Sequence, residues 1–234
     1  GGITYDGITY IMPTSDLRLA GENVIKELKE ISAGYGMIFP VPEVWLPFFE
    51  NENYEVSHNV DDADYIFSSS KLATFPGRKL HGKRNLLHQF MSLYTPTMKL
   101  FDNETLSEAR KIMEIWQNES GLPENETDYK PTMEALDNFR NLKLCGAVFY
   151  TDGSPSGFLV GEEINNSMYG IHFAKARKDV KGIYQYMFSQ CSSIHIEKYE
   201  FINLEQDMGK ETLRSAKSSY QPDRMAAKYR LVRR

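Results

Sequence analysis

The sequence predicts an α/β protein with mixed, mostly antiparallel sheets, and three observations support this prediction. Segments with helical periodicity alternate with shorter segments of strand periodicity along most of the 234 residues. In the second part of the chain, three strand-like segments follow one another with short polar turns between them, which is typical of antiparallel pairing. Apolar residues make up 41% of the chain, enough for the cores of one large or two small domains.

The first part of the chain predicts strands that alternate with two helices. Leu19, Val24 and Leu28 lie roughly on one side of the first predicted helix. Ser15 or Asp16 would cap this helix, because a short polar side chain accepts hydrogen bonds from the free N–H groups of the first turn. The expected elements are a strand at 8–13, a helix at 16–31, a strand at 37–41, a short helix at 43–49, and strands at 54–58 and 63–68.

The second part predicts a longer series, in which Asp152–Gly153 supplies a hairpin turn. The order of its elements is that of the GNAT acyltransferase fold, and the first seventy residues match the second half of such a unit. We therefore expect a truncated N-terminal GNAT-like unit at 1–70 and a C-terminal GNAT-like unit at 71–234. The expected elements are a helix at 78–94, a strand at 98–101, helices at 105–117 and 128–141, strands at 144–150, 156–163 and 167–174, a helix at 180–191, a strand at 199–203, a helix at 208–217 and a strand near 225–232.

Composition and motifs exclude several classes of protein. No run approaches 18 apolar residues, so the sequence predicts no transmembrane segment. The N-terminus has no basic region before an apolar stretch, which is unlike a signal peptide. Two cysteines, Cys145 and Cys191, predict a reduced, cytoplasmic protein. Neither C-x-x-C nor H-E-x-x-H occurs, and the five histidines lack metal-ligand spacing, so we expect no metal site.

The charge is unevenly distributed along a chain with a formal net charge of −5. Residues 1–70 contain three Lys and Arg against twelve Asp and Glu, whereas residues 205–234 contain eight against four. A strongly acidic first part argues against general coating of nucleic acid, because phosphates repel it. The distribution leaves room for a local phosphate-binding cleft in the second part.

Two basic segments are candidate anion sites. Near the C-terminus, Lys210, Arg214 and Lys217 share one face of the predicted helix at 208–217. At 77–90, the sequence GRKLHGKRNLLHQF combines glycines and cations at the start of a predicted helix, which suits phosphate or carboxylate. The alternative for each segment is a solvated, positively charged face that only keeps the domain soluble.

Three stretches, at 63–90, 169–190 and 199–229, resemble the bacterial proteins that share the phosphatidylglycerol lysyltransferase C-terminal domain. The resemblance covers the chain from about residue 63 to its end. It implies tandem GNAT-like units similar in fold to the peptidoglycan interpeptide aminoacyltransferases. Those enzymes move an aminoacyl group from aminoacyl-tRNA to an amine or hydroxyl acceptor.

The resemblance leaves the donor open between aminoacyl-tRNA and acyl-CoA, with no tightly bound cofactor. The stretch at 177–182 reads RKDVKG and lacks the GNAT pyrophosphate loop R/Q-x-x-G-x-G/A, which weakens the acetyl-CoA alternative. The expected partners are therefore tRNA and a small-molecule or peptide acceptor. The lysyltransferase proper is membrane-anchored; because this sequence shows no such anchor, we do not expect a lipid acceptor.

Three residues are candidates for catalysis. Lys217 matches a lysine that recurs near the C-terminus of the family, and it would stabilise the developing oxyanion; the alternative is pairing with Asp207 or Glu211. Glu162 would be a general base if burial raises its pKa, and is otherwise a surface glutamate on a strand. Tyr220 would donate a proton to the leaving group, or else would pack its ring and bond its hydroxyl to backbone.

Four residues are candidates for substrate binding. Arg214 would bind phosphate bidentately, or else form a structural salt bridge. Lys83, Arg84 and Asn85 would hold tRNA phosphate or an acceptor carboxylate, with Asn85 alternatively satisfying backbone groups. A composite site requires the helices at 78–94 and 208–217 to approach one another. The alternative function is a catalytically silent GNAT-like module that binds an anionic metabolite or an RNA end.

Overall fold

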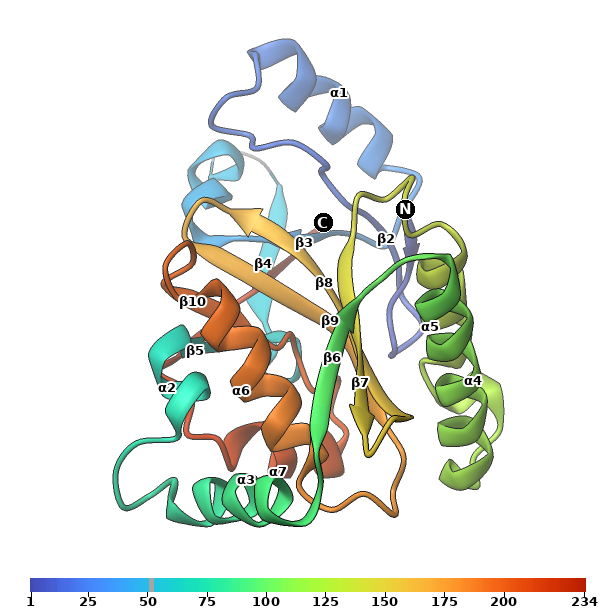
Figure 1. The fold of residues 1–234 in the computed structure, drawn as a ribbon. Helices are drawn as coiled ribbons and strands as arrows, with labels where there is room; N and C mark the ends of the chain where they lie inside the picture. Colours follow the sequence, from blue (N-terminus) through green and yellow to red (C-terminus); the bar gives the residue numbers. More distant parts are fainter. Residues whose placement is uncertain (51–52) are drawn as a thin grey trace. The chain divides into compact units, whose positions relative to one another are not determined.

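The computed structural model describes residues 1–50 and 53–234, which form two compact units (Figure 1). The first unit consists of Gly1–Tyr65, Gln206–Lys217 and Arg224–Arg234, and the second of Ile66–Glu205 and Ser218–Asp223. The sequence analysis placed the boundary after residue 70 and assigned everything beyond it to the second unit. In the structure, Gln206–Lys217 and Arg224–Arg234 instead join the first unit. The contacts that hold them there are with residues far away in the chain, so no local sequence pattern predicts them.

The first unit contains a five-stranded sheet, and its third and fifth strands flank the last strand of the chain. β12 pairs antiparallel with both β3 and β4, while β2 pairs parallel with β3. The single strand expected near 225–232 is thus two short strands, of which β11 covers Arg224–Ala226. The strand order is β1 (Gly2–Ile3), β2 (Thr9–Ile11), β3 (Met37–Val41), β12 (Tyr229–Arg233) and β4 (Tyr54–His58).

The helices of the first unit are short, and the first begins later than expected. α1 covers Glu22–Ser32 with Gly21 at its N-cap, so the prediction of a cap at Ser15 or Asp16 was wrong. Asp16 instead accepts hydrogen bonds from the backbone N–H of Arg18 and from Nε1 of Trp45, each at 3.0 Å. The other helices are the 3-10 helices η1 (Glu43–Phe49) and η2 (Val60–Asp62) and the helix α7 (Glu211–Ser218).

The second unit is built on six strands, of which β9 and β10 run parallel and the other neighbours antiparallel. Asp152 and Gly153 have φ values of 50° and 80°, which confirms the predicted hairpin turn between β7 and β8. β10 pairs with only Met168–Gly170 of β9, so β9 continues beyond it. The strand order is β5 (Asp64–Ser68), β10 (Phe201–Asn203), β9 (Met168–Ala176), β8 (Ser154–Asn165), β7 (Cys145–Thr151) and β6 (Pro96–Leu100).

Helices cover both faces of this sheet, because strand side chains alternate between its faces. Val148 and Tyr150 of β7 pack into a core with α4 and α5, while Phe149 contacts Tyr186 of α6. α2 was not expected from the sequence. No helix in the described part of the chain is long and apolar enough to cross a bilayer. The helices are α2 (Ser69–Thr74), α3 (His81–Leu93), α4 (Asn103–Ser120), η3 (Glu124–Glu126), α5 (Tyr129–Asp137) and α6 (Ile183–His195).

Candidate functional site

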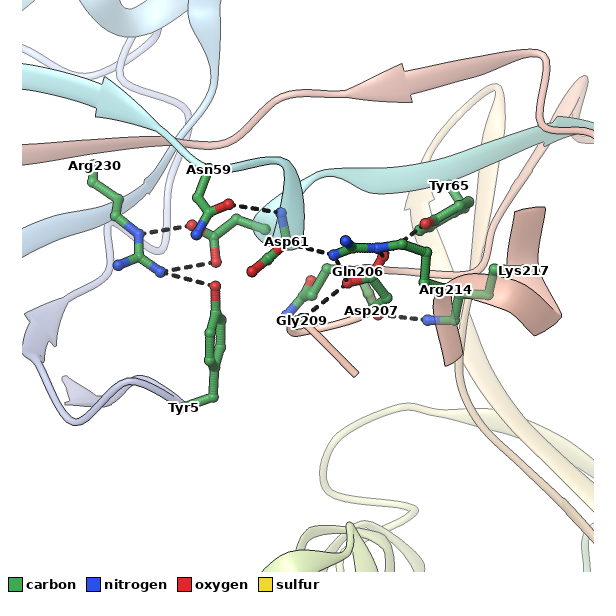
Figure 2. A network of polar contacts seen from close by, with 11 residues as sticks. Tyr5, Asn59, Asp61, Tyr65, Gln206, Asp207, Gly209, Arg214, Lys217 and Arg230 are labelled. Carbon is green, nitrogen blue, oxygen red and sulfur yellow. Dashed lines mark hydrogen bonds and ion pairs between the residues drawn. The ribbon is translucent and has the colours of Figure 1, made fainter. Parts of the chain in front are cut away.

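The cationic helix α7 is bound by carboxylates of the first unit (Figure 2). The Nε and Nη2 atoms of Arg214 donate to the two oxygens of Asp207, each at 2.9 Å, and Nη2 also donates to Asp61 at 2.5 Å. These contacts, to Asp207 first and Asp61 second, raise the pKa of the guanidinium. They are the contacts of the structural salt bridge that the sequence left open as the alternative for Arg214.

Asp207 is the centre of this network and is fully buried. Besides Arg214, it accepts hydrogen bonds from the hydroxyl of Tyr65 at 2.7 Å and from the backbone N–H of Gly209 at 2.9 Å. The hydrogen bonds from Arg214, reinforced by Tyr65 and Gly209, lower the pKa of Asp207 to about 2 against the cost of burial. Asp207 therefore stays ionised at physiological pH and fixes the start of the α7 segment.

Lys217 lies one turn beyond Arg214 on α7. Its Nζ donates to the backbone carbonyl of Gln206 at 2.6 Å and lies 5.9 Å from the centroid of the Tyr65 ring. This contact to a backbone carbonyl was not expected from the sequence. The role of Lys217 in catalysis stays a prediction.

In the second unit, the structure brings together Lys83 and Tyr220, which the sequence proposed for different roles. The Nζ of Lys83 lies 4.0 Å from the centroid of the Tyr220 ring, a cation–π distance. No hydrogen bond or ion pair within the described residues engages this ammonium group. Burial lowers the pKa of Lys83 below its ordinary value, because the charged form loses hydration.

Tyr220 is buried among aromatic rings, and its hydroxyl accepts a hydrogen bond from Nε2 of Gln185 at 2.7 Å. The ring contacts Phe75 and Phe188, with centroid distances of 5.8 and 5.5 Å. Burial raises the pKa of the phenol, so it remains protonated. The packing matches the structural alternative for Tyr220, although the hydroxyl bonds to a side chain rather than to backbone.

Arg84 and Asn85 lie on the first turns of α3 with different surroundings. The Nη1 of Arg84 donates to the backbone carbonyls of Phe75 at 2.5 Å and Gly77 at 3.1 Å. Arg84 therefore holds the loop before α3, while Asn85 is exposed. Lys83 and Lys217 belong to different units, and their convergence on one cleft stays a prediction.

Glu162 belongs to a cluster of three titratable side chains that sequence analysis did not assemble. Its Oε1 lies 3.1 Å from Nε2 of His172 on β9, and Nδ1 of His172 lies 2.7 Å from Oε1 of Glu205. Glu205 comes two residues after the end of β10, and β9 extends beyond its pairing with that strand. His172 therefore links β8 to the segment that leaves β10, and all three side chains are partly exposed.

The hydrogen-bonding pattern requires a proton within this cluster. Burial alone would lower the pKa of His172, but the hydrogen bond and charge of Glu205, and then those of Glu162, outweigh it and raise the pKa. If Nδ1–H donates to Glu205, a proton must also lie between Nε2 and the Glu162 carboxylate, since two lone pairs would repel. The two carboxylates thus favour the protonated form of His172, whose two ring N–H groups can donate to Glu162 and Glu205.

Glu162 was a candidate from the sequence, but His172, Glu205 and Gln185 were not. The expected hairpin of strands at 156–163 and 167–174 contained the signal for His172, because its register brings Glu162 close to it. Glu205 offered no local signal. Its place depends on β10 ending at Asn203 and on a left-handed backbone at Glu205, with φ of 59°.

The two units, with helices around mixed sheets, define a GNAT-like acyltransferase fold, so the predicted fold class is confirmed. A family model described as "Phosphatidylglycerol lysyltransferase, C-terminal" matches residues 6–232. The chain therefore belongs to this family, and the resemblance seen in the sequence is confirmed.

Three relatives illustrate the match. A conserved protein of unknown function from Bacteroides thetaiotaomicron is 26% identical, with a TM-score of 0.82 over 96% of this chain and 79% of that one. The L-PGS structure from Bacillus licheniformis is 17% identical, with a TM-score of 0.68 over 99% of this chain and 83% of that one. An uncharacterised protein of Mycoplasmoides gallisepticum is 27% identical over 180 residues; the match spans 75% of this chain and 57% of that protein.

Proposed function

We propose that this protein transfers an acyl group, with aminoacyl-tRNA as the donor and an amine or hydroxyl of a small molecule or peptide as the acceptor. The observation that carries the proposal is the Glu162–His172–Glu205 cluster. Acyl transfer to an amine or hydroxyl requires a group that takes the proton of the nucleophile. A histidine held between two carboxylates, on β9 beyond the residues that pair with β10, is suited to that role.

The proposed step balances around this cluster. The acceptor amine or hydroxyl attacks the ester carbonyl of the aminoacyl group, and the bond from that carbonyl to the ribose oxygen of the tRNA breaks. The nucleophile gives its proton to the deprotonated Glu162–His172 pair, which returns a proton to the leaving ribose oxygen. Glu205 contacts Nδ1 of His172 and acts by positioning that ring. With acyl-CoA as the donor, the leaving atom would be the thioester sulfur.

The cationic groups supply the binding part of the proposal. Lys83 lies on α3 within the basic segment at 77–90, and its ammonium has no carboxylate partner in the described residues. We assign to it the binding of a phosphate or carboxylate of the substrate. The ring of Tyr220 contacts the Lys83 ammonium through a cation–π interaction, and the Tyr220 hydroxyl stays protonated. The role of Lys217 as an oxyanion donor stays a prediction; its Nζ donates to the carbonyl of Gln206.

The transfer of labelled amino acid from aminoacyl-tRNA tests the proposal. Lysyl-tRNA is the first donor to try because of the family's name, with acetyl-CoA as the second donor. Small amines, short peptides and phosphatidylglycerol vesicles are the acceptor arms. We expect Glu162→Gln to lower turnover by about a hundredfold, on the scale of losing a general base, with little change in tRNA affinity.

Glu163→Gln is the matched control for this experiment. Glu163 is the next residue on β8, but it binds Lys198 and Tyr199 instead of His172. We expect it to retain activity. Equal activity of both variants would refute the role of Glu162.

The ammonium of Lys83, which has no carboxylate partner in the described residues, also suits the second candidate, a GNAT-like module that binds an anionic metabolite or RNA end without chemistry. The same assay separates the two. Retained tRNA binding, weakened by Lys83→Ala and with no transfer to any acceptor arm, would support the binding module.

A further inference from the structure

A cavity opens on the second unit where α4 begins and α5 ends, and its lining contains none of the candidate site residues described above. Its volume is about 360 Å³, within the range of small-molecule sites. Its polar lining includes Asn103 and Arg110 of α4 and Arg140 beyond α5. A cavity of this size, lined by two guanidinium groups from separate segments, is suited to binding a small anion.

Arg110 is fixed in the cavity wall by acceptors on α5. Its Nε donates to Asp137 at 2.9 Å and its Nη2 donates to the backbone carbonyl of Leu136 at 3.2 Å. Its Nη1 has no hydrogen bond within residues 1–50 and 53–234. One side of the guanidinium is thus anchored while further N–H donors remain for a ligand.

Arg140 is held in a similar way from the other wall. Its Nη2 donates to the side-chain oxygen of Asn103 at 2.9 Å. The Nε and Nη1 of Arg140 have no partner in the part of the chain that the structure describes. Asn103 thereby positions Arg140 beside the start of α4.

The rim of the cavity is ordered by its own backbone. The N–H groups of Leu142, Lys143 and Leu144 donate to the carbonyls of Asn138, Arg140 and Phe139, at 2.9, 3.2 and 3.1 Å. The ring of Phe139 packs edge-on against Phe101 at 5.1 Å. A preformed rim lowers the entropy cost of holding a ligand.

Charge selects the ligand. The lining residues contain two arginines against one carboxylate, Asp137, which is already bound to Arg110. We propose that this cavity binds a small molecule through a carboxylate or phosphate group, held by the unengaged N–H donors of Arg110 and Arg140. Planar guanidinium groups match both oxyanions bidentately. The site is independent of the proposed transferase step.

Thermal unfolding and calorimetry of the full chain test this inference, with inorganic phosphate and succinate as separate probes against chloride at equal ionic strength. We expect at least one probe to raise the melting temperature progressively with concentration. Arg140→Ala should weaken the binding of that probe by at least about tenfold, on the scale of a charge-assisted hydrogen bond. The probe that binds distinguishes a phosphate ligand from a carboxylate ligand.

Two variants make the outcome decisive. Lys111→Ala removes the same charge from an exposed position of α4 outside the lining, and we expect it to bind like the wild type. Arg140→Lys keeps the charge but not the fork of donors, and should bind more weakly than the wild type. No effect of either probe on the wild type, or equal loss in Lys111→Ala and Arg140→Ala, would overturn the inference. Because binding is the readout, a failure of the transferase proposal leaves this result unaffected.

Discussion

At the scale of single residues, His172 decides when the proposed base is available. Its pKa is raised by Glu205 and Glu162, so the ring stays protonated to higher pH than an isolated imidazole. Only the ring that has lost this proton accepts another from a nucleophile. The rate of transfer is therefore expected to rise with pH through the raised pKa of His172.

Glu205→Gln tests this dependence without removing the base. The amide keeps the shape but not the charge, so we expect the pKa of His172 to fall and the acid limb of kcat/KM to move to lower pH. An NMR titration of the His172 ring, assigned by comparison with His172→Asn, measures the same shift without activity. Glu200→Gln, at an exposed position near β10, is the control. An unchanged ring titration in Glu205→Gln would contradict the assignment.

The candidate site shows how far sequence reasoning reaches at this scale. Glu162, Lys83 and Tyr220 were singled out one by one because their residue types and local patterns carry chemistry. The partnership of Lys83 with Tyr220 was not foreseen, because the two lie 137 positions apart in the chain and meet only through the packing of Tyr220. His172 and Glu205 depend on strand register and on the end of β10, which single-residue propensities do not fix.

At the scale of elements, α7 depends on its anchors. The helix has eight residues and no buried side chain, so neither its propensity nor an apolar face holds it. Its fixed points are the ion pair of Arg214 with Asp207 and the bond from Lys217 to Gln206. We therefore expect α7 to be lost before the strands of the first unit when these contacts are removed.

Asp207→Asn tests the anchoring of α7. We expect a loss of about 2 kcal/mol at pH 7, discounted from the cost of breaking a fully buried pair because Arg214 is partly exposed. Because the folded pKa of Asp207 is about 2, its contribution is present above the unfolded value near 4 and is lost as pH falls through 2. The gap between wild type and variant should shrink over that window.

Hydrogen exchange shows where this loss falls. Amides of α7 should exchange faster in Asp207→Asn, while those of β3 should change less. Glu211→Gln, at an exposed position of the same helix, should behave like the wild type. If both variants match in urea unfolding and exchange, Asp207 does not anchor the helix.

Some elements of the first unit were predicted correctly from the sequence, and others were not. The bounds of β3 and η1 agree with expectation, because β3 is a buried apolar run and η1 is a short aromatic segment that begins directly after Pro42. α1 starts later because Asp16 is used by Arg18 and Trp45 instead of capping a helix. The strand order of the first unit could not be predicted, since β12 enters its sheet from the far end of the chain.

At the scale of the whole molecule, β12 makes the first unit depend on the last residues of the chain. It lies between β3 and β4, and Leu231 is fully buried in the core of this unit. Arg230 binds both oxygens of the buried Asp62, at 2.7 and 3.0 Å, and its Nη2 also contacts Tyr5 (Figure 2). Removing β12 would therefore split the sheet and leave Asp62 buried without its counter-ion.

Each unit contains one tryptophan of the chain, which allows the two to be followed separately. Trp45 belongs to the first unit and Trp116 to the second. We expect deletion of residues 227–234 to abolish the cooperative urea transition of Trp45 fluorescence, measured in a Trp116→Phe background. The transition of Trp116, measured in a Trp45→Phe background, should remain, because the second unit has its own core around α4, α5 and β7.

Leu231→Ala should lower the midpoint of the Trp45 transition by the equivalent of about 2–5 kcal/mol. Val232→Ala, at a partly exposed neighbouring position, should change it by less than about 1 kcal/mol. A Trp45 transition that survives the deletion unchanged would mean that β12 is dispensable, and that the first unit is complete without the end of the chain.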